Sequence, residues 1–195
     1  MSAPAQTLRS DNRRELILES AADLFVRRGY GGTSMRDIAK ATGMLSGSLY
    51  YHFASKEALL LSVFEEGVRL LSDSVDQALA AAPNDPWERL QAGAQAHLSV
   101  LLDGSNFAHV VVRVLPGDAP GAQAALIALR DQYEARFYTI VDALPLDPQT
   151  DPSILRLMLL GAMNHTPVWF QPGRATPAEL ARHFIRNLRG TAATP

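Results

Sequence analysis

Hydrophobic residues recur along most of the chain at the spacing of an α-helix. Between residues 122 and 144 the apolar positions advance by three or four residues at each step, which places them on one stripe of an amphipathic helix. These positions are Ala122, Leu126, Leu129, Tyr133, Phe137, Ile140 and Leu144. No segment alternates apolar and polar residues long enough to predict a convincing strand, and the β-branched run His109–Leu115 would have nothing to pair with. The pattern predicts an all-α protein.

Glycine and proline clusters divide the chain into about nine predicted helices. At three breaks an oxygen-bearing side chain precedes proline, in Asp85-Pro86, Asp151-Pro152 and Thr176-Pro177. This arrangement is typical of a helix cap followed by proline at the first helical position. The longest predicted helix covers residues 55–82 and would be about 40 Å long. We expect it to connect the N-terminal part of the chain to the rest.

The N-terminal part predicts three helices with short connections. The first covers Arg13–Arg28 and ends at a glycine. Thr33-Ser34 caps the second, Met35–Ala41, and Gly43 allows a tight turn before the third, Ser46–Phe53. Two short helices joined by a glycine-containing turn predict a helix-turn-helix, whose second helix lies in the major groove of DNA.

The outer face of the third predicted helix carries small hydroxyl groups and aromatic rings and no carboxylate. Leu49 and Phe53, four residues apart, would face inward and leave outside Ser46, Gly47, Ser48, Tyr50, Tyr51 and His52. Hydroxyls can donate to phosphates, and aromatic rings can contact thymine methyl groups. On the residues alone, a protein-binding surface is the alternative.

Composition and charge narrow the function further. The 195 residues include no cysteine, which excludes a disulfide scaffold, a thiolate zinc site and cysteine catalysis. Up to Lys56 there are eight basic and five acidic residues, and beyond it ten basic and fifteen acidic, so only the N-terminal part suits a polyanion. No apolar run is long enough to cross a bilayer, and residues 1–7 lack the features of a signal peptide. We expect a cytoplasmic protein without a membrane partner.

Several ordered motifs of the N-terminal part occur together in one known family. They are Gly29-Tyr30, Thr33-Ser34-Met35-Arg36-Asp37-Ile38-Ala39, Gly43, Gly47-Ser48-Leu49-Tyr50-Tyr51-His52-Phe53 and Ser55-Lys56-Glu57. The stretch from Arg14 to Val63 resembles the DNA-binding domain of the TetR family of bacterial repressors. The resemblance implies a homodimer that binds a double-stranded DNA operator. Leu45 stands where the family usually has serine or threonine, so we expect Ser46 to supply the helix cap and phosphate contact.

The predicted DNA contacts combine the exposed helix face with the matching motifs, and Lys56 adds a cation for a phosphate. They are Thr33, Ser34, Met35, Arg36, Ser46, Gly47, Ser48, Tyr50, Tyr51, His52 and Lys56.

The remainder of the chain contains no recognisable catalytic motif. Its histidines, His97, His109, His165 and His183, have no metal-ligand partner one helical turn away, so we expect no metal or cofactor. Large apolar side chains there would fill a core or line a ligand cavity, and both interpretations stay open. The candidates for the cavity are Phe64, Trp87, Phe107, Tyr133, Phe137, Met158, Met163 and Trp169.

The last two predicted helices offer a surface for dimerisation. The candidate interface residues are Leu157, Gly161, Asn164, Val168, Leu180, Phe184 and Leu188. In the TetR family the corresponding helices build a four-helix dimer interface. Gly161-Ala162-Met163-Asn164 and Trp169-Phe170-Gln171-Pro172-Gly173 are similar to a TetR branch that controls fatty-acid and steroid catabolism and responds to coenzyme A thioesters.

That resemblance implies an acyl-CoA inducer. Its acyl group would lie among Phe137, Met158 and Trp169, and its phosphates would need a basic patch drawn from Arg113, Arg130, Arg136 and Arg156.

The sequence thus predicts a ligand-responsive repressor that an inducer releases from a palindromic operator. We expect a disordered tail at 1–9, a helix-turn-helix domain at 10–54, a ligand-binding and dimerisation domain at 55–190, and a second tail at 191–195. The alternatives are a DNA-binding regulator without an inducer and a helical enzyme.

Overall fold

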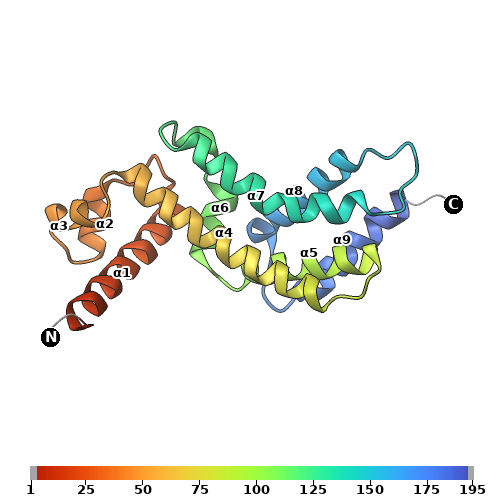
Figure 1. The fold of residues 1–195 in the computed structure, drawn as a ribbon, viewed down its shortest axis with the longest axis horizontal. Coiled ribbons are helices and arrows are strands. Elements are labelled where there is room, and N and C mark those ends of the chain that lie inside the picture. Colours follow the sequence, from red (N-terminus) through yellow and green to blue (C-terminus); the bar gives the residue numbers. More distant parts are fainter. Residues whose placement is uncertain (1–3, 193–195) are drawn as a thin grey trace. The chain divides into compact units, whose positions relative to one another are not determined.

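The computed structural model describes residues 4–192, and all regular structure in this range is helical (Figure 1). Nine α-helices and one 3-10 turn follow one another within the described residues. They are α1 (Pro4–Arg28), α2 (Met35–Ala41), α3 (Ser46–His52), α4 (Lys56–Ala81), α5 (Pro86–Leu102), α6 (Asn106–Arg113), the 3-10 turn (Pro116–Asp118), α7 (Gln123–Asp142), α8 (Pro152–Trp169) and α9 (Pro177–Ala192). The predicted all-α class is confirmed, and the β-branched run that begins at His109 forms most of helix α6 and not a strand.

The predicted helix starts carry the expected caps. The Asp85 carboxylate accepts a hydrogen bond from the Glu88 amide at 3.0 Å, and the Asp151 carboxylate accepts one from the Ser153 amide at 2.8 Å. At α9, the Thr176 amide donates to the Glu179 carboxylate at 2.7 Å. Each cap satisfies backbone donors that a helix leaves unpaired at its N-terminus.

The first and last helices of the chain are longer than the sequence predicts. Helix α1 begins at Pro4, so residues 4–9 belong to the helix and not to a disordered tail. Proline suits the first position of a helix because a backbone N–H there has no partner within the helix, so proline loses no hydrogen bond by lacking it. Helix α9 likewise extends to Ala192. The rest of the two predicted tails, residues 1–3 and 193–195, lies outside the described residues.

Contacts between helices divide the chain into two compact units. Unit 1 contains the chain up to Val68 together with Asn106–Leu129, and unit 2 contains Arg69–Ser105 and the chain from Arg130 onward. Helices α4 and α7 contribute residues to both units. The division therefore differs from the predicted domain boundary after residue 54.

Unit 1 includes α6 because this helix packs against α1 and α4. The Asn106 amide donates to the Asp23 carboxylate of α1 at 3.5 Å. On α4, Gly67 faces α6 so closely that a Cβ atom there would collide with the Phe107 carbonyl oxygen and lie 2.6 Å from a methyl of Val111. Glycine at this position lets the two helix backbones meet.

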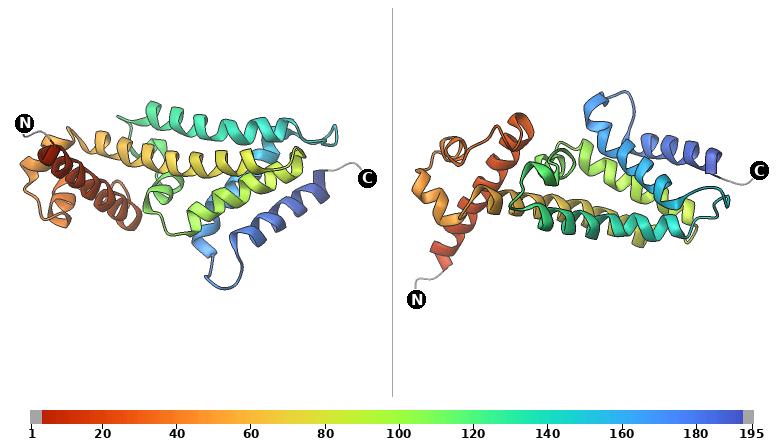
Figure 2. Two further views of the ribbon diagram at one scale, coloured as in Figure 1. Left: turned by 60° about the horizontal axis from the view of Figure 1, so that its bottom comes forward. Right: turned by 90° about the horizontal axis from the view of Figure 1, so that it is seen from above.

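Unit 2 is built around α5, which packs against α8 and α9. Figure 2 shows α5 and α9 running side by side. The buried Gly93 of α5 lies under Phe137 of α7, whose ring would be 3.7 Å from a Cβ atom at that position. The apolar stripe of α7 is buried along its length, except that Leu129 is half-buried. Its prediction from the sequence is confirmed.

Candidate functional site

The turn between α1 and α2 is held by hydrogen bonds of three side chains, those of Thr33, Ser34 and Asp37. The Thr33 hydroxyl donates to the carbonyl oxygens of Leu24 at 3.2 Å and Gly29 at 2.9 Å. Ser34 caps α2 by accepting from the Asp37 amide, while the Asp37 carboxylate accepts from the Ser34 amide at 2.9 Å. The Ser34 hydroxyl also donates to the Asp37 carboxylate, and this bond, together with the one from the Ser34 amide, holds the pKa of the Asp37 carboxyl below its usual value. Ser34 remains exposed.

Two of the predicted DNA contacts are therefore internal. Thr33 is buried with its hydroxyl already donating, and Met35 is buried in the core of unit 1. The sequence motif alone could not show that Thr33 and Met35 face inward while Ser34 and Arg36 are exposed. Helical spacing shows which residues share a face, but not which face packs against the other helices.

Helix α3 presents the predicted polar and aromatic surface. Leu49 and Phe53 are buried and anchor the helix, while Ser46, Gly47, Ser48 and Tyr50 are exposed. Tyr51 is 86% exposed, and its ring meets the half-buried His52 edge to face at 5.5 Å.

The start of α3 has no side-chain cap. Leu45 occupies the N-cap position and makes no capping hydrogen bond, and its side chain is 80% exposed. Ser46 is the first residue of the helix itself, so the expectation that Ser46 supplies the missing cap is wrong. A hydroxyl caps a helix from the preceding, non-helical position.

Lys56, at the start of α4, is bound to the α1–α2 turn. Its ammonium donates to the carbonyl oxygens of Tyr30 and Thr33, each at 3.0 Å, and lies 4.1 Å from the centre of the Tyr30 ring. Burial raises the pKa of Tyr30 to about 12, and the neighbouring Glu57 carboxylate adds to the shift. Lys56 is thus a structural link as well as a surface cation, a role that no local sequence signal indicates.

A hollow of about 480 Å³ opens between these elements of unit 1. It brings Arg36 of α2, Tyr50 of α3 and Lys56 of α4 to one surface. Its lining residues are Gly31, Gly32, Thr33, Ser34, Met35, Arg36, Asp37, Tyr50 and Lys56. Two cations and a phenol around one concave surface can hold a phosphate group.

Unit 2 contains a chain of polar side chains, of which His97 and Tyr133 are buried and Asn164 is half-buried. The His97 ring lies between the Tyr133 hydroxyl, 2.5 Å from Nδ1, and the Asn164 side-chain oxygen, 3.0 Å from Nε2. Because Asn164 presents an oxygen, Nε2–H donates to it, and Nδ1 accepts from Tyr133. Burial lowers the pKa of His97 to about 4, against the opposing effect of Asn164, and burial raises the pKa of Tyr133.

Asn164 therefore does not lie where the sequence places it. Its side chain bonds to His97 inside unit 2 and does not join the outer face of α8. No local signal links these residues, because His97 and Tyr133 are 36 positions apart and His97 and Asn164 are 67 apart.

The predicted cavity residues lie in several different environments. Trp87, Tyr133, Phe137 and Met163 are packed in the core of unit 2. Phe64 is buried in unit 1, where Phe107 is half-buried.

Met158 and Trp169 are exposed on α8. The proposed acyl site among Phe137, Met158 and Trp169 is wrong, because Phe137 is fully buried and the other two face outward.

The outer face of α8 carries an exposed apolar stripe. Leu157 is 56% exposed and Val168 is 65% exposed, and Gly161 between them has open space where a side chain would stand. The exposed positions repeat every three or four residues, at Ile154, Leu157, Met158, Gly161, Ala162, His165, Val168 and Trp169. On α9, the candidate residues Leu180, Phe184 and Leu188 are half-buried.

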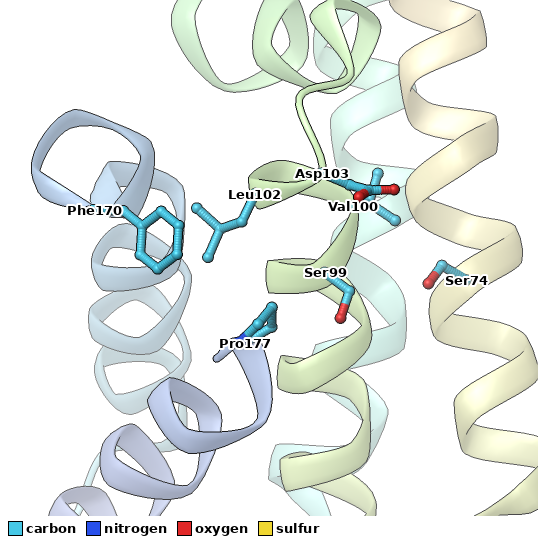
Figure 3. Close-up of a pocket in the computed structure, with 7 residues that line it drawn as sticks. All are labelled: Ser74, Ser99, Val100, Leu102, Asp103, Phe170 and Pro177. Atoms are coloured by element: carbon cyan, nitrogen blue, oxygen red, sulfur yellow. The ribbon is translucent and has the colours of Figure 1, made fainter. Parts of the chain in front are cut away.

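Among the hollows that the described residues of unit 2 form, two were not predicted from the sequence. One, of about 510 Å³, lies at the C-terminal end of α5 and is lined by Ser74, Ser99, Val100, Leu102, Asp103, Phe170 and Pro177. Figure 3 shows Leu102, Phe170 and Pro177 toward one side of it and Ser74 and Asp103 toward the other. The second, of about 310 Å³, is lined by Trp169, Phe170, Gln171, Arg174, Ala175 and Leu180. Of the predicted cavity residues, only Trp169 lines either of them.

Two of the arginines predicted to bind phosphates are occupied by carboxylates. Arg136 pairs with Asp76 through two bonds of 2.7 Å, and Arg156 pairs with Glu134 at 2.6 Å. The Arg136–Asp76 pair holds the pKa of the Asp76 carboxyl below its usual value. These two arginines do not form the expected basic patch.

Within the described range, no group of histidines and carboxylates is arranged to hold a metal ion, and no helix is long and apolar enough to span a membrane.

Comparison with known families covers most of the chain in two parts. Residues 17–63 match the bacterial regulatory proteins of the tetR family. Residues 83–191 match the tetracyclin repressor-like C-terminal domain.

Curated relatives match mainly over part of the chain. The HTH-type transcriptional repressor KstR2 of Mycolicibacterium smegmatis is 40% identical over 88 residues, which are 45% of this chain and 42% of that protein. The HTH-type transcriptional activator FasR of the same species is 40% identical over 86 residues, 44% of this chain and 39% of that protein. The chain thus matches about two fifths of the length of these relatives.

A solved structure extends the similarity to nearly the whole chain. The structure of AibR in complex with isovaleryl coenzyme A and operator DNA is similar to this chain, with 29% sequence identity and a TM-score of 0.77. The similarity covers 89% of this chain and 96% of the AibR chain.

Proposed function

Because the chain belongs to the tetR family of bacterial regulatory proteins, we propose that it is a homodimeric transcriptional repressor that binds operator DNA and is released by a small molecule. The observation that carries the proposal is the surface of α3. Buried Leu49 and Phe53 hold this helix, and its hydroxyl and phenol groups face outward without a carboxylate. Such a surface can enter the major groove, while Arg36 and Lys56 meet the phosphates beside it.

A second copy of the chain is the partner that fits the α8 stripe. An exposed stripe of aliphatic residues on a helix is unfavourable in water and marks an interaction surface. Gly161 and Ala162 at its centre would let two helices approach closely. In a symmetric dimer the two α3 helices would read half-sites about 34 Å apart or somewhat more, in a near-palindromic operator.

An acyl-CoA thioester is the class of inducer that we propose. Its support is the resemblance of the C-terminal part to regulators of fatty-acid and steroid catabolism, together with the similar AibR, whose structure holds isovaleryl coenzyme A. The 510 Å³ hollow of unit 2 offers apolar Leu102 and Phe170 to an acyl group, and its volume is within the usual range for ligand sites. Helix α4, which contributes residues to both units, would carry the response to the DNA-binding surface.

Reciprocity between the two ligands tests this proposal. A coupling of about 1–3 kcal/mol would change operator affinity about 5- to 150-fold, and operator must weaken inducer binding by the same factor. We expect calorimetric titration with a panel of acyl-CoAs, with and without operator DNA, to show this factor for at least one thioester and not for free coenzyme A. Binding that operator leaves unchanged would exclude the acyl-CoA as inducer.

One observation favours a regulator without an inducer. In the core of unit 2, Phe137 and Met163 are fully buried, and His97 is bonded at both ring nitrogens. In that case no acyl-CoA of the panel would bind, while operator binding would persist.

We further propose that the chain has a regulatory and not a catalytic role, because the relatives are transcriptional regulators. We also propose that it is located in the cytoplasm, where operator DNA lies.

Lys56 and Arg36 should respond differently to the loss of their charge. Lys56→Met removes hydrogen bonds to two backbone carbonyls, so we expect it to cost about 1–2 kcal/mol of stability as well as DNA affinity. Arg36→Met removes an exposed charge and should reduce the salt slope of DNA binding by about one without changing Tm. Thermal unfolding and salt titrations of both variants measure this. Equal Tm values would show that Lys56 is only a surface cation.

A further inference from the structure

The exposed Leu45 is the least expected side chain on the DNA-facing surface of unit 1. It is 80% exposed and immediately precedes the exposed residues Ser46, Gly47 and Ser48. It makes no capping bond to α3. A leucine in this position leaves the helix start uncapped and exposes an isobutyl group to water, so stability of the isolated chain does not account for it.

The position of Leu45 determines what it can meet. The N-terminal residues of a recognition helix are the ones that contact base edges in the major groove. A leucine side chain cannot donate or accept a hydrogen bond, so it gains nothing from phosphates or from the polar edges of bases. The apolar group that B-DNA presents in the major groove is the C5-methyl of thymine.

We propose that Leu45 is a specificity-determining residue that contacts a thymine methyl group in each operator half-site. The inference rests on the proposed operator binding and deepens it, because it assigns one chemical feature of the operator to one side chain. Leu45 is exposed and directly precedes the exposed residues of α3, so we expect DNA that covers Ser46 and Ser48 to cover Leu45 as well. Leu45 thereby discriminates between bases, whereas Arg36 and Lys56 contribute equally on every sequence.

Removing the methyl group from the DNA tests the assignment without altering the protein fold. The probe is the duplex that the wild-type protein selects from a randomised library, with each thymidine replaced in turn by deoxyuridine in both half-sites. At one position per half-site we expect wild-type affinity to fall about ten- to twentyfold, which is about fourfold for each lost methyl contact. The Leu45→Ser variant should bind the thymidine and deoxyuridine duplexes equally at that position.

The Tyr51→Ala variant is the matched control, because Tyr51 is also highly exposed but lies at the other end of α3. It should keep the deoxyuridine sensitivity at the position that Leu45→Ser loses. If no replacement weakens the wild type, or if the same replacement weakens Leu45→Ser equally, the assignment is overturned while operator binding stands. Failure of the wild type to select any sequence would overturn operator binding itself, and the assignment with it.

Discussion

A chain that carries Leu157→Asp and Val168→Asp is expected to be monomeric and to lose at least about 100-fold of its operator affinity. Both side chains are more than half exposed in the single chain, so the substitutions should not disturb its own core. In a dimer through α8 each carboxylate would be buried without a partner, at a cost of about 3–5 kcal/mol. That cost corresponds to more than a 100-fold loss of association.

Sedimentation and operator titration of the same samples measure both effects, with helix content as the check on folding. Tyr138→Asp, at an exposed tyrosine of α7, is the control and should leave a dimer with full affinity. The structure favours these positions over Phe184 and Leu188, which are half-buried against unit 2 itself, so that charges there would damage the fold as well. A monomer that binds operator at full affinity would contradict the dimeric repressor.

Acidification from pH 7 to pH 5 should destabilise the protein by about 2 kcal/mol through His97 alone. Burial lowers the pKa of this imidazole from its ordinary value of 6.5 to about 4 in the folded chain. Between these values the unfolded chain binds a proton that the folded chain does not. The neutral ring therefore contributes stability that is fully present above about pH 6.5 and is lost as the pH falls toward 4.

Urea unfolding at pH 7, 6 and 5, at one protein concentration, measures this slope. His97→Gln removes the titrating group while its amide can still donate and accept, so the variant should be less stable at pH 7 but lose less stability on acidification. His183→Gln changes an exposed histidine of α9 and should keep the wild-type slope. If His97→Gln and the wild type have the same slope, His97 does not remain neutral in the folded chain.

The helices could be predicted because their signals are local. The spacing of apolar residues in α7, the caps at Asp85, Asp151 and Thr176, and the glycine-containing turn before α3 each lie within a few residues of the element they specify. The resemblance to the TetR family rests on equally local motifs, and the family match confirms it.

The direction in which side chains point could be predicted only in part. Tyr51 and Ser48 face outward as expected, but Thr33 and Met35 of the same motif face the core. On α8, Leu157 and Val168 lie on the outer stripe, whereas Asn164 turns inward to His97. A helical stripe shows which residues share a face, and which neighbour that face meets depends on other helices.

Patterns in the amino-acid sequence were enough to predict the all-α class, the helix-turn-helix, the exposed face of α3 and the family. Other contacts became visible only in the folded chain: Lys56 binds the α1–α2 turn, His97 bonds to Tyr133 and Asn164, and carboxylates pair with Arg136 and Arg156. The partners in these contacts are 22 to 67 residues apart. Hydrogen bonds and ion pairs act over a few ångströms, so they form only after packing has brought such residues together, and no periodicity in the chain encodes them.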